Sequence, residues 1–288
     1  MPTAFQRVTI LGLGLMGGSL GLALRQRGVA REVVGWARRR ETAAAAMAAG
    51  AVARVAETPD EAVRGAELVV VGIPVFSIPP IVTACAAAID DGAVVTDVGS
   101  TKGEIMRRLA GSWPDGRATF VGSHPMAGSE RTGLDAARAE LYEGAMVAVT
   151  PSALAGPEAV ERVCRLWWNV GGLVRVMDAD THDRLVARTS HLPHLVAAAL
   201  VDAVLGATPD AESVSFCGAG FRDTTRVAAG SAEMWRDVVF TNRAAVLAAL
   251  DRFTQALGAV REQIAAGDEP GVQAFLARVC EARRVLSK

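Results

Sequence analysis

The feature that most constrains the fold of this chain is the stretch TILGLGLMGGSLGLAL near its N-terminus. In it, an apolar run is followed at once by Gly12, Gly14 and Gly17 in G-x-G-x-x-G spacing, and then by a helix-forming segment. Such glycines allow a tight turn and close approach of the backbone, and free amides at the helix start, in the turn of Leu15 and Met16, can hold a pyrophosphate. The stretch therefore predicts a dinucleotide-binding unit; a purely structural glycine turn is the alternative.

Eight short apolar runs lie between residue 7 and about residue 178 and alternate with alanine-rich segments. Most are continuous rather than alternating, as in strands that are covered on both faces. The runs are RVTILGLG, EVVGWA, VARVA, LVVVGIP, AVVTDVG, ATFVGSHP, AMVAVTP and LVRVMD. Beyond them the pattern is helical to the end of the sequence. We therefore predict an α/β fold, with a doubly wound, mainly parallel Rossmann-type sheet in residues 1–178 and an all-helical domain in residues 179–288.

The helical part contains a long uninterrupted amphipathic stretch. From Ser231 to Ala265 there is one internal glycine and no proline, and apolar residues recur at spacings of three and four. This predicts a single helix of roughly 50 Å, with a break near Gly258 as the alternative. A domain of about 110 residues cannot cover such a helix by itself, so we expect a second copy of the chain to pack against it, forming a homodimer through the helical domain.

The charge balance excludes several classes of partner. Thirty basic and 31 acidic residues, with a pI near 6.4, create no general attraction for nucleic acid or an anionic membrane, so we expect a small-molecule substrate. The apolar stretches carry glycines or prolines and predict no membrane span. The four cysteines form no C-x-x-C pair, which argues against a zinc site or a disulfide framework and fits a reducing cytoplasm.

A run of arginines bears on the choice between NAD and NADP, which differ by a phosphate on the ribose. Roughly 20 residues past the last glycine, an enzyme that uses NAD normally presents Asp or Glu to the ribose 2′-hydroxyl. Here Ala37 stands at that place and is followed by Arg38, Arg39 and Arg40, which can pair with a 2′-phosphate. We therefore expect NADP in preference to NAD; the alternative is that these arginines only form a solvated turn.

Three of the predicted strands end in candidate site residues, at the edge of the sheet where ligands bind in α/β folds. The ends are VGIP at Pro74, DVGSTKG with Asp97, Ser100 and Lys102, and VGSHPMAGSE with Ser123, His124 and Glu130. A histidine at such an end can accept a proton from a hydroxyl as hydride leaves its carbon. His124, one of four histidines in the chain, is therefore the candidate base; a hydrogen-bonded loop histidine is the alternative.

The helical half adds two basic constellations. His191 and His194 in TSHLPHLVAAAL are three residues apart on one helical face. Arg222 and Arg226 in GFRDTTRVAAGSAEMWRD are four apart, a poor arrangement unless an anion lies between them. This favours an anionic substrate. Histidines 182, 191 and 194 raise the possibility of a metal, but because no cysteine lies nearby we expect none.

Taken in order, the glycine loop, DVGSTKGEI, GSHPMAGSERTG, SHLPHLVAAAL and FRDTTRVAAGSAEMWRDV resemble the prephenate and arogenate dehydrogenase family. The resemblance runs from about residue 7 to the end of the long helical stretch. It implies a nucleotide-binding domain followed by a helical dimerisation domain. It also implies a reaction of tyrosine biosynthesis, the oxidative decarboxylation of a cyclohexadienol, prephenate or arogenate. Hydride passes to NAD(P), a ring carboxylate leaves as carbon dioxide, and aromatisation supplies the driving force.

The resemblance further implies roles for individual residues. His124 hydrogen-bonds the ring hydroxyl and takes up its proton, and Ser100 helps to orient both this hydroxyl and the nicotinamide. Arg226 holds the ring carboxylate. The remaining assignments are His194 and His191 lining the substrate site, Trp235 reaching in from the partner subunit, Glu130 and Arg222 as a charged pair at the entrance, and Pro74 beside the cofactor.

Two other functions share parts of this pattern. A β-hydroxyacid or 6-phosphogluconate type of dehydrogenase has the same two-part architecture but needs a catalytic lysine in its helical half, where this chain has only the terminal Lys288. A nucleotide-sensing protein would bind NADP without turnover. The side chain of the substrate is open, because the sequence does not decide whether Glu130 or Asp223 meets an ammonium group. Competitive inhibition by tyrosine is open as well.

Overall fold

The structure is a computed structural model that describes residues 4–110, 118–128 and 131–287. The chain forms two compact units, residues 1–242 and residues 243–288. The first unit carries the sheet and the helices up to Asn242, and the second is a pair of helices.

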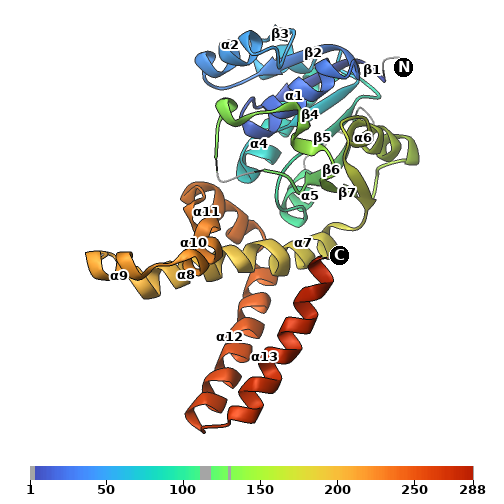
Figure 1. The fold of residues 1–288 in the computed structure, drawn as a ribbon. Helices are drawn as coiled ribbons and strands as arrows, with labels where there is room; N and C mark the ends of the chain where they lie inside the picture. The colour runs from blue at the N-terminus through green and yellow to red at the C-terminus, as the bar shows by residue number, and fades with distance from the viewer. Residues whose placement is uncertain (1–3, 111–117, 129–130, 288) are drawn as a thin grey trace. The chain divides into compact units, whose positions relative to one another are not determined.

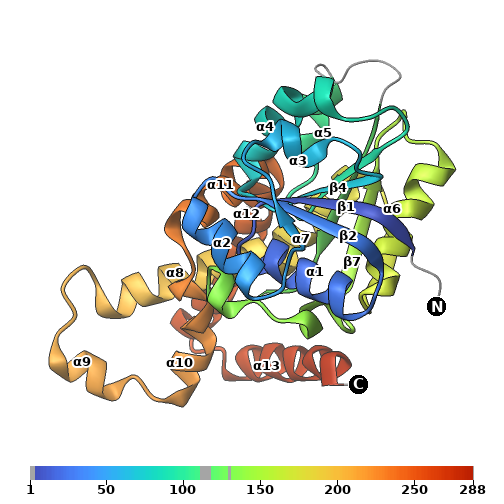
Figure 2. The ribbon, with the colours of Figure 1, turned by 90° about the horizontal axis from the view of Figure 1, so that it is seen from above.

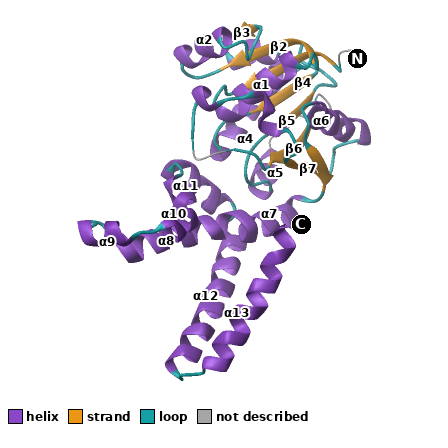
Figure 3. Ribbon diagram, viewed as in Figure 1, coloured by secondary structure: helices purple, strands orange, loops and turns teal. Residues whose placement is uncertain are grey.

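The first unit is built on an eight-stranded sheet with the order β3-β2-β1-β4-β5-β6-β7-β8; Figures 1 and 3 label its strands from β1 to β7. The strands are β1 Phe5–Leu11, β2 Ala30–Trp36, β3 Arg54–Val55, β4 Leu68–Val71, β5 Val94–Asp97, β6 Thr119–Pro125, β7 Met146–Pro151 and β8 Leu173–Val176. All neighbours pair in parallel except β6 and β7. The predicted doubly wound, mainly parallel sheet is confirmed, and each of the eight apolar runs overlaps one strand.

Both faces of the sheet are buried, which explains the continuous apolar runs. In β4, Leu68 and Val70 pack into one core, while Val69 and Val71 pack into the other. Helices α1 Leu15–Gln26 and α6 Pro157–Asn169 cover the first face, together with α2 Arg40–Ala48. The second face is covered by α3 Pro59–Val63, α4 Ile78–Cys85 and α5 Gly103–Ala110 (Figure 2). A strand between two helical layers has no polar face, so its sequence cannot alternate.

After β8 the described chain is helical, as predicted. The helices of the first unit that follow are α7 Ala179–Val186, a π-helical turn η5 Ala187–His191, α8 Leu192–Leu205, α9 Ala211–Phe216, α10 Ala219–Thr225, the turn η6 Arg226–Ala229 and α11 Ala232–Thr241. Among the described residues, no helix combines the length and the apolar character needed to cross a membrane.

The prediction of one helix from Ser231 to Ala265 is wrong. The stretch is two helices, α11 and α12 Arg243–Ala265, and the break lies at Asn242 rather than near Gly258, which α12 passes without interruption. Asn242 leaves helical geometry, with φ −119° and ψ 30°. Its amide donates to the backbone oxygen of Asp183 at 2.8 Å, and this bond to a distant helix stabilises the break. In the second unit, α12 is followed by α13 Glu269–Arg284.

Candidate active site

The carboxyl ends of four parallel strands meet at one edge of the sheet. Leu11 at the end of β1 is paired with Val71 of β4, which is paired in turn with Asp97 of β5. Because β6 is parallel to β5, its end at His124 and Pro125 projects beyond the same edge. The glycine loop, Pro74, Ser100 and His124 therefore follow neighbouring strands at the edge where ligands of such sheets bind.

The glycine loop has the geometry of an anion cradle. Gly12 has φ 104°, and a Cβ there would lie 2.4 Å from the backbone oxygen of Gly72. A Cβ on Gly17 would lie 1.8 Å from the oxygen of Gly12, whereas nothing lies within 4 Å of a Cβ on Gly14. Gly14 begins α1 without a side-chain cap, and no acidic residue lies in the first turn. The backbone amides of this turn are thus available to a pyrophosphate, so the loop fits a dinucleotide.

The residues at this helix start, Gly14, Leu15 and Met16, are partly exposed. The carbonyl of Met16 accepts a hydrogen bond from the buried Tyr142 hydroxyl at 2.6 Å, which fixes the first turn of α1 from one side. Leu15 opens the helix, and its amide, like that of Met16, belongs to the first turn, whose amides lack partners within the helix.

The arginine run follows β2 beside the start of α2. Arg39 is the N-cap residue of α2, and Arg38 precedes it; both are exposed. Neither side chain has a hydrogen bond or ion pair within the described residues, whereas the Arg40 side chain pairs with Glu57 at 3.0 Å. Two of the three guanidinium groups are therefore available for a ligand.

A buried polar frame joins the end of β5 to the end of β6. Lys102 forms an ion pair with Asp97, and both side chains are fully buried. The Lys102 ammonium also donates to the backbone oxygen of Ser123 at 2.9 Å, and the Ser123 amide donates to Asp97 Oδ1 at 3.0 Å. Ser100 lies in the loop between Asp97 and Lys102. Because burial makes an unpaired charge very costly, this frame holds the Ser100 loop and the strand preceding His124 in one arrangement.

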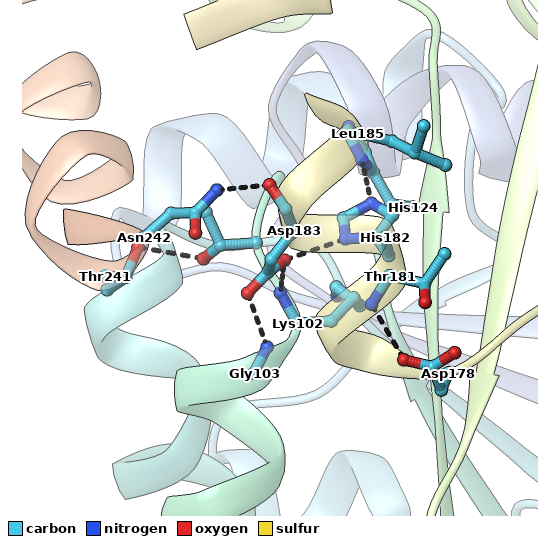
Figure 4. A network of polar contacts seen from close by, with 12 residues as sticks. Lys102, Gly103, His124, Asp178, Thr181, His182, Asp183, Leu185, Thr241 and Asn242 are labelled. Atoms are coloured by element: carbon cyan, nitrogen blue, oxygen red, sulfur yellow. Dashed lines mark hydrogen bonds and ion pairs between the residues drawn. The ribbon is translucent and has the colours of Figure 1, made fainter. Parts of the chain in front are cut away.

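The ring of His124 is held in place by a contact with a second histidine. His124 is partly buried, and its Nδ1 lies 2.9 Å from Nε2 of His182 on α7. His182 is fully buried, and its Nδ1 lies 2.8 Å from Asp183 Oδ1 (Figure 4). Oδ1 and Oδ2 of Asp183 accept from the backbone amides of Lys102 and Gly103, each at 2.8 Å. A line of three side chains thus runs from the candidate base to the start of α5.

The surroundings of His124 favour its neutral form. Burial, the nearby His182 and the Lys102 ammonium hold the pKa of His124 well below its ordinary value of 6.5. For Asp183, burial alone would raise the pKa, but the hydrogen bonds from His182 and the amides of Lys102 and Gly103 outweigh it and lower the pKa. A neutral imidazole can accept a proton.

The helical part brings His191, His194 and Trp235 together. The His194 and Trp235 rings are stacked, with centroids 3.6 Å apart, and His191 meets the Trp235 ring edge-on at 6.1 Å. His191 Nε2 and His194 Nδ1 are buried without a hydrogen-bond partner among the described residues. Burial lowers the pKa of His194, and it lowers the pKa of His191 to about 4. Buried donors or acceptors left without a partner are suited to a ligand.

The other predicted substrate residues lie near this cluster or outside the described residues. Arg226 begins η6, whose next residue, Val227, has its backbone hydrogen-bonded to His194. Arg222 lies four residues earlier on α10; both arginines are exposed. Glu130 lies outside the described residues. The two parts of the candidate site are joined by Asn242, whose amide donates to the Asp183 backbone and lies 3.3 Å from His191 Nδ1.

The contacts of His182, Asp183 and Asn242 were not predicted from the sequence. His182 and Asp183 are adjacent near the start of a helix, and His182 was noticed only as part of a weak metal pattern. In the described residues, no group of three or more His, Cys, Asp or Glu side chains is placed to hold a metal ion. No local signal in the sequence indicates the contact of His182 with His124, which lies 58 residues earlier.

The comparison with protein families decides the assignment. Residues 20–176 match the nucleotide-binding domain of prephenate dehydrogenase, and residues 178–278 match its dimerization domain. The chain belongs to the prephenate dehydrogenase family. The matched segments meet close to Asp178, where the sheet ends and α7 begins.

Family members with solved structures or curated sequences resemble the chain over nearly its whole length. Cyclohexadienyl dehydrogenase of Zymomonas mobilis is 33% identical over 268 residues, which are 92% of this chain and 91% of that protein. Prephenate dehydrogenase of Aquifex aeolicus, solved with hydroxyphenyl propionate and NAD+, superposes with a TM-score of 0.91 at 31% identity, covering 99% of this chain and 100% of that one. Arogenate dehydrogenase of Synechocystis has a TM-score of 0.82 at 28% identity, covering 98% and 100%.

This family membership settles the class of reaction. The chain is an NAD(P)-dependent oxidoreductase of tyrosine biosynthesis that oxidatively decarboxylates a cyclohexadienol, prephenate or arogenate. The β-hydroxyacid dehydrogenase and the non-catalytic sensor are therefore the less supported alternatives.

Proposed function

We propose that His124 is the general base of this prephenate dehydrogenase family enzyme. One observation carries the proposal: His124 stands at the end of β6, at the edge onto which the glycine loop opens, and its other ring nitrogen is tied to the buried His182 and Asp183. In this role the imidazole hydrogen-bonds the ring hydroxyl of the substrate and takes its proton as the hydroxyl becomes a carbonyl. Ser100, in the loop tied to the same frame, orients the hydroxyl.

For the cofactor, we assign the pyrophosphate to the amides at Gly14, Leu15, Met16 and Gly17, with Gly12 permitting the turn. When bound, the nicotinamide cofactor accepts the hydride from the ring carbon. We place Pro74 and Ser100 beside it because they follow β4 and β5, two neighbouring strands that end at the same edge as β1. Arg38 and Arg39 carry the proposed preference for NADP over NAD, because both are exposed and adjacent.

For the substrate, we assign the ring carboxylate to Arg226. His194 and His191 are assigned to the wall of the substrate site, and Trp235 packs on His194 within its own chain. Arg222 is assigned to the entrance of the site as one half of a charged pair, and the other half, Glu130, lies outside the described residues. An anionic, flat ring suits arginine, imidazole and indole groups. Prephenate and arogenate, or an amino-substituted analogue, remain alternatives for the side chain.

We further propose a two-domain homodimer, with a dinucleotide-binding domain in residues 1–178 and a dimerisation domain in residues 179–288, working in the cytoplasm. Apolar side chains of α12 and α13, such as Leu257, Ile264 and Leu276, are more than half exposed in the single chain. Burial of such side chains against a second copy is favourable. The four cysteines are free thiols, in keeping with a reducing compartment.

Removing the arginine pair tests the cofactor assignment. In Arg38→Ala/Arg39→Ala we expect the KM for NADP to rise about tenfold or more, since charge-assisted hydrogen bonds contribute about 1.5–3 kcal/mol each, while the KM for NAD changes little. Steady-state rates with each cofactor at saturating substrate provide the measurement. Arg40→Ala is the matched control, because Arg40 is occupied by Glu57. Equal changes for NADP and NAD would remove the argument.

The pH dependence of the reaction tests the state of His124. The base must be neutral, and protonation at low pH abolishes activity; because the pKa of His124 lies well below 6.5, this loss begins only below that pH. The pKa values of His191 and His194 are also lowered, so neither adds a loss at higher pH. We expect kcat/KM, measured from about pH 4.5 to about pH 8, to stay constant as the pH is lowered to about 6.5 and to fall only below that pH. An acid limb centred above 6.5 would contradict this environment.

A further inference from the structure

The contact between two histidines needs an explanation beyond the roles assigned above. His182 lies on α7 between His124 and Asp183, and all its ring nitrogens have partners: His124 at 2.9 Å and Asp183 at 2.8 Å. The two imidazole rings meet edge to face, with centroids 5.1 Å apart and an angle of 79° between their planes. Figure 4 shows the three side chains joined one to the next by these two contacts.

The direction of these hydrogen bonds follows from the carboxylate. Asp183 is held ionised by His182 and by the two backbone amides of Lys102 and Gly103, so it can only accept. The proton between Asp183 and His182 is therefore on His182 Nδ1. A neutral His182 then has its lone pair on Nε2, and this nitrogen accepts from Nδ1–H of His124. His124 in turn has its lone pair on Nε2.

Hydrogen bonds to its backbone and side chain fix Asp183, so its carboxylate stays beside His182. The backbone oxygen of Asp183 accepts from the amide of Asn242 at 2.8 Å, and its side chain is bonded at the first residue of α5. Both anchors lie in the first compact unit, as do both histidines. The line of side chains from Asp183 through His182 to His124 is thus fixed at Asp183.

We propose that His182 is a positioning residue that fixes His124 in the tautomer whose Nε2 is the base. This inference rests on the proposed role of His124. When the O–H bond of the substrate hydroxyl breaks, its proton goes to His124 Nε2, and the bond electrons stay on the oxygen that becomes a carbonyl. His124 is then a cation whose Nδ1–H still donates to His182, and the Asp183 carboxylate faces the new charge through His182.

Two substitutions separate this role from simple packing. Leucine at position 182 removes the acceptor and frees His124 to adopt the tautomer with Nε2–H, which has no lone pair for the substrate. Glutamine has a similar reach, and its amide oxygen accepts from His124 Nδ1. We expect kcat to fall about ten- to a hundredfold in His182→Leu, with the KM for the cofactor little changed, and to recover to within about fivefold of the wild type in His182→Gln.

The matched control is Arg184→Ala, an exposed position on the same helix α7, which should retain the wild-type kcat. A direct reading comes from ¹⁵N NMR of histidine-labelled protein, in which the four histidines are assigned by single substitutions. We expect His124 in the wild type to carry its proton on Nδ1, and to lose this preference in His182→Leu.

The outcomes separate this inference from the base assignment. A wild-type kcat in His182→Leu, a His182→Gln that is as slow as His182→Leu, or Nε2–H on His124 in the wild-type spectrum would each overturn the role of His182, even if His124→Asn is inactive. A fully active His124→Asn would instead overturn the base assignment, whatever the spectrum shows. If His182→Leu does not fold, the wild-type spectrum and His182→Gln still decide.

Discussion

Replacing His124 by asparagine is expected to lower kcat by about a hundredfold or more, because general base catalysis by a positioned side chain contributes about 10²–10⁴ to the rate. Asparagine is close in size, and its amide NH₂ stands near the place of Nδ1, so it can still donate to His182 Nε2. The variant therefore removes the basic nitrogen while leaving the contact behind it. We expect the KM for substrate to change only modestly, since the lost interaction is strongest in the transition state.

The controls for this variant are its KM for the cofactor and its Tm, which report on the rest of the site. The KM for the cofactor and the Tm should stay near those of the wild type, because the glycine loop and the Asp97–Lys102 pair do not depend on the imidazole. If kcat stayed within a few-fold of the wild type, His124 would be only a hydrogen-bonded histidine at the end of β6.

Replacing Arg226 by alanine is expected to act on binding. The guanidinium is the proposed partner of the ring carboxylate, and a hydrogen bond to a charged group contributes about 1.5–3 kcal/mol, so we expect the KM for substrate to rise about ten- to a hundredfold. The KM for the cofactor should be unaffected, because Arg226 lies on η6, after α10, and not on the glycine loop. Initial rates over a range of substrate concentrations provide the measurement.

Two further variants make this result specific. Arg226→Lys keeps the charge but loses the planar pair of donors, so its KM should lie between those of the wild type and the alanine variant. Arg175→Ala, at an exposed position on β8, removes the same charge elsewhere and should leave the KM unchanged. A KM that is equally raised in Arg175→Ala would mean that only the net charge matters; an unchanged KM in Arg226→Ala would place the carboxylate elsewhere.

The sheet could be predicted because its signals are local. Strands such as LVVV, buried on both faces, need continuous β-branched runs, and the glycine spacing reflects clashes within a few residues of each other. The antiparallel pairing of β7 with β6 and the end of α11 at Asn242 were not visible. The break at Asn242 depends on its bond to Asp183, 59 residues away, and nothing in the amphipathic pattern of residues 231–265 records that bond.

The candidate site was predictable to the same extent. Polar residues after apolar strands pointed to Ser100 and His124, because parallel strands end at one edge. The residues that contact these side chains could not be predicted, because they come from other parts of the chain. His182, for example, is 58 residues from His124. The complete burial of Lys102 was also unexpected from the sequence, because lysine is almost never fully buried unless it is paired, and here the pairing with Asp97 allows it.

The most direct test of the account is the rate of reduced-cofactor formation by the purified chain, with prephenate and arogenate each crossed with NAD and NADP. We expect an aromatic product and reduced cofactor to form in equal amounts with at least one of the two substrates, faster with NADP than with NAD at low cofactor concentration. His124→Asn, assayed beside the wild type, should lose this activity with every pair. Cofactor binding without reduction in all four combinations would contradict the assignment of the chain as a cyclohexadienol dehydrogenase.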